Sequence, residues 1–216
     1  MKTISGPPQR VRIVGNMRVT FPRLPDRERA YALVERDDGA VYRLYGGVAG
    51  PRLPHDIRHL VVERELHIPD GIWGGIASGI VFDSMYYVSG RRPPHARERS
   101  GQLLAAFGQR GLRAEALADF VECVAGLDHP SDTQILTLAA TRLTVLPPAD
   151  AEVDPAEVAA AAQALQVEAA RWARLRVGQE LSYEWPRAAL ATRKRTGAHK
   201  PRVVRPHKKR KGRGPA

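Results

Sequence analysis

Residues 53–63 contain the highest density of side chains that could carry out chemistry. His55, His59 and Glu63 are spaced four residues apart. On an α-helix, at 100° per residue, they fall within about 80° of one face. Two imidazoles at positions i and i+4 can bind one ion, as in the His-Glu-x-x-His zinc helix. The spacing therefore predicts a metal site, with zinc as the expected ion, on a helix over residues 54–66.

The roles of two carboxylates beside the histidines stay open at this point. Asp56 follows the first histidine and could position a catalytic water, although its side chain is one methylene shorter than the usual glutamate base. Glu63 could be the third metal ligand, or it could orient a liganding histidine. Asp56 and Glu63 are the candidate catalytic residues. Three other histidines could supply the third ligand if the fold brings them close: His67, His95 and His129.

A purely structural interpretation fits the same residues. The expected helix is apolar on both sides, so its polar side chains should be at least partly buried. Buried polar groups need hydrogen-bond partners. In this interpretation His55 and His59 are hydrogen-bonded core residues, and Glu63 pairs with a base such as Arg58 or Arg64.

The order of residues in this segment also suggests a family. The run Leu-Pro-His-Asp-x-x-His-x-x-Val-Glu over residues 53–63, followed by Gly-Ile-Trp-Gly at 71–74, resembles a family of uncharacterised bacterial proteins. Those proteins have an N-terminal hairpin before this run and a Gly-aromatic-x-Gly segment after it. The resemblance covers residues 17–80. It implies that the histidine helix and the glycine-rich helix belong together, and it implies no established activity.

The residues before this segment are typical of β-structure. Residues 10–14 and 17–21 predict two strands with a turn at Gly15-Asn16. Residues 30–34 and 41–45 predict a hairpin, because Asp37-Asp38-Gly39 between them supplies the positive φ of a tight turn.

The residues after this segment are mostly helical in pattern. We expect a linker from Pro147 and helices that cover one face of an antiparallel sheet. Residues 10–186 are thus predicted to form a single α+β domain, after a flexible N-terminus at 1–9. The expected elements are helices at 54–66, 70–86, 97–108, 113–126, 131–143 and 154–176, and a short strand within 180–185.

The charge of the chain is concentrated at its C-terminal end. The 216 residues carry a formal net charge of +11, from 34 bases and 23 acids. Residues 187–216 hold 12 of the bases and no acid, which leaves the first 186 residues with a net charge of −1. Such a basic segment should be disordered when no partner is bound, and it should bind RNA, including ribosomal RNA, or DNA. The alternatives to nucleic-acid binding are an anionic lipid surface or no specific partner. The candidate nucleic-acid-binding residues are Arg193, Lys194, Arg195, Lys208, Lys209, Arg210, Lys211 and Arg213.

Composition excludes several classes of protein. A single cysteine, Cys123, cannot form an internal disulfide or a thiolate zinc site. The first residues contain no apolar run, so no secretory signal is expected. The longest uncharged apolar stretch is 12 residues, from 71 to 82, which is too short to cross a bilayer. A soluble cytoplasmic protein is predicted. Its function is either a zinc-dependent hydrolase using the histidine helix, or a non-catalytic nucleic-acid- or ribosome-associated protein.

Overall fold

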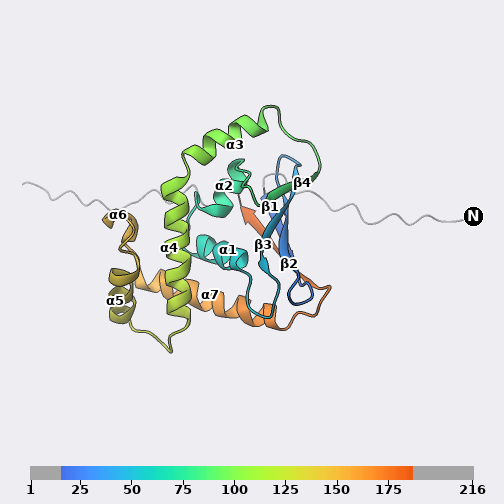
Figure 1. Cartoon of the computed structure of the whole chain (residues 1–216). Helices are drawn as coiled ribbons and strands as arrows, with labels where there is room; N and C mark the ends of the chain where they lie inside the picture. The colour runs from blue at the N-terminus through green and yellow to red at the C-terminus, as the bar shows by residue number, and fades with distance from the viewer. Residues whose placement is uncertain (1–15, 187–216) are drawn as a thin grey trace, which may run out of the picture.

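A five-stranded antiparallel sheet forms one layer of the molecule (Figure 1). The computed structural model describes residues 16–186. The strand order is β4-β3-β2-β1-β5, so the last strand in sequence pairs with the first. This arrangement confirms the predicted α+β class. The strands are β1 (Asn16–Pro22), β2 (Arg29–Glu35), β3 (Val41–Val48), β4 (Met85–Ser89) and β5 (Glu180–Pro186).

The β2–β3 hairpin forms as predicted from its turn residues. Gly39 has a φ of 90°, a conformation that glycine adopts without steric cost. Asp38 accepts a hydrogen bond from the Ala40 backbone N–H and so stabilises the turn. Val34 and Leu44 lie on the face of the hairpin that is buried in the core. The alternate residues of the two strands, such as Leu33 and Arg43, lie on the opposite face.

The longer helices lie on the buried side of the sheet and pack mainly against one another. Figure 1 shows α1 between the sheet and the longer helix α4, with the helix α7 below α1 in this view. α1 contacts β3, α4 and α7, and its apolar residues at 57, 60, 61 and 62 are fully buried. This central position explains why α1 is apolar on both sides. The helices are α1 (His55–Glu65), α2 (Ile72–Ser78), α3 (Ala96–Ala105), α4 (Gly108–Ala125), α5 (Asp132–Arg142), α6 (Pro148–Ala151) and α7 (Pro155–Ala173).

The predicted helix over residues 70–86 is wrong in its second half. α2 ends at Ser78, because Gly79 has a φ of 120° and ends the helix. The chain then forms β4, which pairs with β3 at the edge of the sheet. The short apolar run of β4 itself is compatible with either a helix or a strand, and pairing with β3 decides between them.

Three smaller differences concern where elements begin. Asn16 is the first residue of β1, so it does not form the expected turn. α4 begins at Gly108, and Gly111 lies inside it rather than before it. A Cβ at Gly111 would lie 2.7 Å from the Phe107 ring, so glycine allows close packing there. One helical turn, α6, forms within the predicted linker.

Several predictions lie outside the described residues. They are the flexible N-terminus at 1–9, the strand at 10–14, and the basic segment at 187–216 with its eight candidate nucleic-acid-binding residues. Within residues 16–186, no helix is long and apolar enough to cross a membrane.

Candidate metal centre

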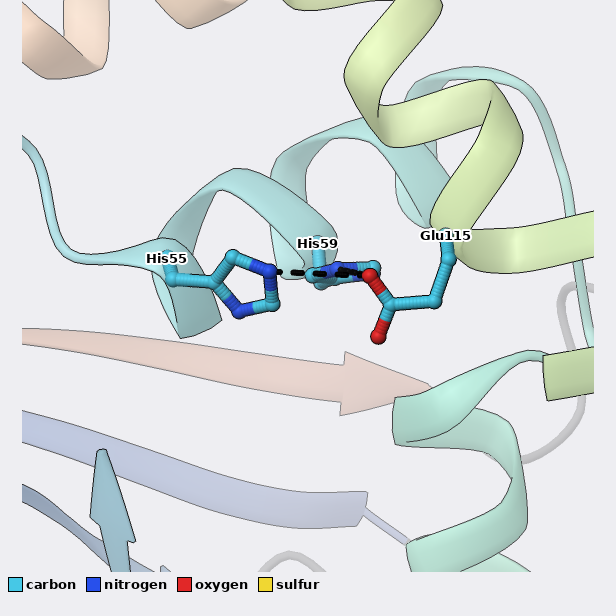
Figure 2. Close-up of side chains that lie close together, drawn as sticks. All are labelled: His55, His59 and Glu115. Atoms are coloured by element: carbon cyan, nitrogen blue, oxygen red, sulfur yellow. Dashed lines mark hydrogen bonds and ion pairs between the residues drawn. The ribbon is translucent and has the colours of Figure 1, made fainter. Parts of the chain in front are cut away.

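Two histidines of α1 and one glutamate of α4 converge at the interface of these helices. Figure 2 shows both imidazole rings directed toward Glu115. Glu115 Oε2 lies 3.1 Å from His59 Nε2 and 3.6 Å from His55 Nε2. The candidate ligand atoms all lie within 4.8 Å of one another. A nitrogen–nitrogen–oxygen donor set of this kind suits zinc and related divalent metals. We refer to His55, His59 and Glu115 as the His–His–Glu group.

The His–His–Glu group lies at the edge of the core and is open to solvent on one side. The side chain of His59 is 2 % exposed, whereas those of His55 and Glu115 are 52 % and 47 % exposed. The protein therefore encloses His59 and leaves the side chains of His55 and Glu115 accessible to solvent. An ion bound here would keep room for water or substrate on the solvent side.

Each histidine also faces a carboxylate with its second ring nitrogen. His55 Nδ1 lies 3.7 Å from Asp56 Oδ1, and His59 Nδ1 lies 3.8 Å from Glu63 Oε1. These distances are longer than direct hydrogen bonds, and His59 Nδ1 is buried with no hydrogen-bond partner within residues 16–186. Metal-binding histidines commonly present the second nitrogen to a carboxylate, which fixes the ring and raises its basicity. Both histidines face a carboxylate in this way, at distances longer than a direct hydrogen bond.

Glu63 connects the histidine helix to the start of α2. Its carboxylate is fully buried and accepts backbone hydrogen bonds from Ile72 N at 2.8 Å and Trp73 N at 3.0 Å. A Cβ at Gly71 would lie 2.5 Å from the carboxyl carbon of Glu63, so only glycine fits there without a shift. α2 thus fixes Glu63, and Glu63 in turn lies against His59.

The side chain of Asp56 faces β3 and not Glu115 Oε2, the oxygen that both histidines face. A Cβ at Gly46 of β3 would lie 2.8 Å from Asp56 Oδ2. The backbone carbonyl of Asp56 accepts a hydrogen bond of 3.0 Å from Trp73 Nε1. Asp56 is therefore placed to orient His55 through Nδ1.

The electrostatics of the metal-free group favour protonated histidines. Asp56 and then Glu115 raise the pKa of His55 to about 9. Burial opposes protonation of His59, but Glu115 and Glu63 outweigh it and raise its pKa. His55 and His59 hold the pKa of Glu115 well below its usual range. The folded-state pKa of His55 lies above its ordinary 6.5. Its ion pairing therefore stabilises the metal-free fold fully below pH 6.5, and this contribution is lost as the pH rises through about 9.

Burial acts differently on Glu63. Removal from water is the largest influence on this carboxyl, and it raises the pKa. The nearby imidazole of His59 and the two backbone N–H donors act in the opposite direction.

The structure brings together part of the site expected from the sequence. His55 and His59 face the same oxygen, as their spacing predicts, while Glu63 lies at the other ring nitrogen of His59. Three histidines considered as a third ligand do not join the group: His67, His95 and His129.

The spacing of residues on α1 does not predict Glu115, because Glu115 is 56 residues from His59 in sequence. One signal could have suggested it: acids recur on one face of α4 at 115, 119 and 122. Asp119 and Glu122 both form ion pairs with Arg58 of α1. Arg58 therefore pairs with α4 and not with Glu63. The acids on one face of α4 thus pair with the histidines and the arginine of α1.

Comparisons with known proteins give no match to this chain among family models, curated proteins or solved structures. The resemblance to an uncharacterised bacterial family therefore stays a prediction.

Proposed function

We propose that His55, His59 and Glu115 bind a divalent transition-metal ion, with zinc as the best match, and that the chain is a metal-dependent hydrolase. The observation that carries this proposal is the convergence of both Nε2 atoms on one oxygen of Glu115, at 3.1 and 3.6 Å. Three protein ligands on a tetrahedral ion leave one position for water. Metal-bound water is a strong nucleophile at neutral pH, which is the chemistry of metal-dependent hydrolysis.

Asp56 and Glu63 act in this proposal as positioning residues. Both lie on the Nδ1 side of a histidine, at 3.7 and 3.8 Å, so they would orient the rings toward the ion. The half-exposed side chains of His55 and Glu115 leave the solvent side open for a substrate.

A purely structural role explains the arrangement less well. Arg58 with Asp119 and Glu122 already links α1 to α4 through ion pairs. A half-exposed pair such as His55 with Glu115 would add little stability to that link. A structural role also does not require both Nδ1 atoms to face carboxylates. In a metal site, such carboxylates orient the histidine rings toward the ion.

Titration of the metal-free chain with zinc by calorimetry at pH 6.5, 7.5 and 8.5 tests the proposal. We expect one zinc per chain and an affinity that rises about tenfold per pH unit for each proton released. Zinc affinity should rise with pH because the pKa of His55 is about 9, so zinc must displace a proton from His55 throughout this range. The groups that influence His55 are Asp56, Glu115, Arg58 and His59. A purified chain free of zinc, manganese and iron that binds none of them would refute the proposal.

We propose nucleic-acid binding through residues 187–216 as a second candidate function, with the histidine helix then structural. Twelve bases without an acid, next to 186 residues of net charge −1, support it. Affinity for a labelled 20-nucleotide RNA or DNA should fall about 10³-fold between 50 and 200 mM salt. Alanine at the eight candidate bases of this segment, in the full chain, should remove most of that salt dependence. Unchanged salt dependence in this variant would contradict the assignment.

A further inference from the structure

Three tyrosines form a continuous row on the face of the sheet that points away from the core. Tyr31 of β2 is paired directly with Tyr45 of β3, and Tyr86 of β4 is opposite Arg43 of β3. The ring centroids of Tyr31 and Tyr45 lie 6.2 Å apart, and those of Tyr45 and Tyr86 lie 5.4 Å apart. Both pairs are edge-to-face. Aromatic side chains thus cross three neighbouring strands without interruption.

Two arginines stack on this row. The guanidinium of Arg29 lies 4.4 Å from the centroid of the Tyr45 ring, and that of Arg43 lies 4.5 Å from the centroid of Tyr31. Arg43 also donates a hydrogen bond of 3.2 Å to the Tyr45 hydroxyl. Neither arginine forms an ion pair with an acid of residues 16–186. Their charges are therefore not neutralised by a described carboxylate. We refer to these five residues as the tyrosine–arginine face.

The tyrosine–arginine face is accessible in the described part of the chain. The alternate residues of the same strands, such as Val34 and Leu44, point into the core. In Figure 1 the helices α1, α4 and α7 lie on that core side of the sheet. Tyr86 is 55 % exposed. A ligand could reach the row without displacing a described helix.

We propose that the tyrosine–arginine face binds single-stranded nucleic acid, with bases stacked on the tyrosine rings or guanidinium planes and phosphates paired with Arg29 and Arg43. Flat aromatic residues on an open sheet offer stacking that every base can use. Two unneutralised cations complement a polyanion. The bases of a duplex are already stacked on each other, so a single strand fits this surface better. The proposal is independent of the metal site, and it adds a base-contacting surface to the second candidate function.

Fluorescence anisotropy with the full chain and labelled 12-nucleotide oligouridine and oligothymidine tests the proposal. Tyr45→Leu and Tyr86→Leu should each weaken binding by about 5- to 150-fold, because each removes a stacking surface. The slope of log affinity against log salt should stay the same in both variants. Arg29→Ala and Arg43→Ala should instead each reduce that slope by about 0.7.

The matched control is Tyr87→Leu. Tyr87 is next to Tyr86 on β4 but packs against the ring of Tyr42, on the opposite side of the sheet, so its replacement should leave affinity unchanged. Circular dichroism and thermal unfolding establish that each variant folds. Tyr86→Leu removes a largely exposed ring and keeps the test valid if Tyr45→Leu does not fold.

Three results would overturn the proposal. The first is unchanged affinity in folded Tyr45→Leu and Tyr86→Leu variants. The second is equally tight binding of a 12-base-pair duplex. The third is binding that is lost when the bases of 187–216 become alanine and that is insensitive to the tyrosines. This third result assigns binding to the C-terminal segment alone, so the face and the second candidate function can fail separately.

Discussion

Replacing Glu115 by glutamine is expected to weaken zinc binding at least about 100-fold and to leave the fold intact. The change removes the charged oxygen that both histidines face. Loss of a residue that only supports a ligand costs 10–100-fold in affinity, so loss of the ligand itself should cost at least the upper value. Glu115 is half-exposed, and the metal-free chain should lose less than about 1 kcal/mol of stability. Calorimetry measures the affinity, and urea unfolding measures the stability.

Glu122→Gln is the control for this experiment. Glu122 lies seven residues further along the same helix, carries the same charge, and pairs with Arg58 outside the His–His–Glu group. It should keep full zinc affinity. If Glu115→Gln binds zinc as tightly as Glu122→Gln does, Glu115 is not a ligand.

Replacing Glu63 by alanine is expected to destabilise the protein by about 3–5 kcal/mol, a large part of the stability of a typical domain. The alanine would remove the acceptor of the buried backbone N–H of Trp73, at about 1–3 kcal/mol, and that of the partly buried N–H of Ile72. It would also leave a cavity against Gly71. Urea unfolding followed by circular dichroism measures the loss.

Two further variants separate the roles of Glu63. Glu65→Ala changes a partly exposed acid on the same helix that pairs with its neighbour Arg64, and it should cost less than about 1 kcal/mol. Glu63→Gln keeps one oxygen for the backbone donors and should weaken zinc binding about 10- to 100-fold as a positioning residue. A variant Glu63→Gln that loses all zinc binding, beside a Glu115→Gln variant that keeps it, would make Glu63 the third ligand.

Glu63 also shows why the stability of the fold and the metal site should be linked. The residue is held by the first N–H groups of α2 and lies 3.8 Å from the buried nitrogen of His59. Disorder of α2 would release Glu63 and, through it, the ring of His59. Bound zinc would in turn stabilise this region.

The elements that the sequence predicts well depend on neighbours along the chain. The β2–β3 hairpin follows from the turn at Gly39, whose positive φ is a local property. The α1 helix and the shared face of His55 and His59 follow from a spacing of four residues. The capping box at Ser131 likewise uses residues three apart, and it begins α5 close to the expected position.

What the sequence by itself determined is therefore the local part of the candidate site: a helix with two histidines on one face and a carboxylate in reach of each. Only the tertiary structure decided which carboxylate faces the Nε2 atoms of both histidines. Glu115 lies beside the Nε2 atoms of both histidines because α4 packs on α1, where Asp119 of α4 also pairs with Arg58 of α1. Glu63 lies on the Nδ1 side of His59 because it accepts a hydrogen bond from the backbone of α2. The same holds for β4, whose apolar residues became a strand because the edge of β3 offered hydrogen-bond partners. Contacts between distant segments depend on how whole elements pack, and the spacing of residues along one element does not contain that information.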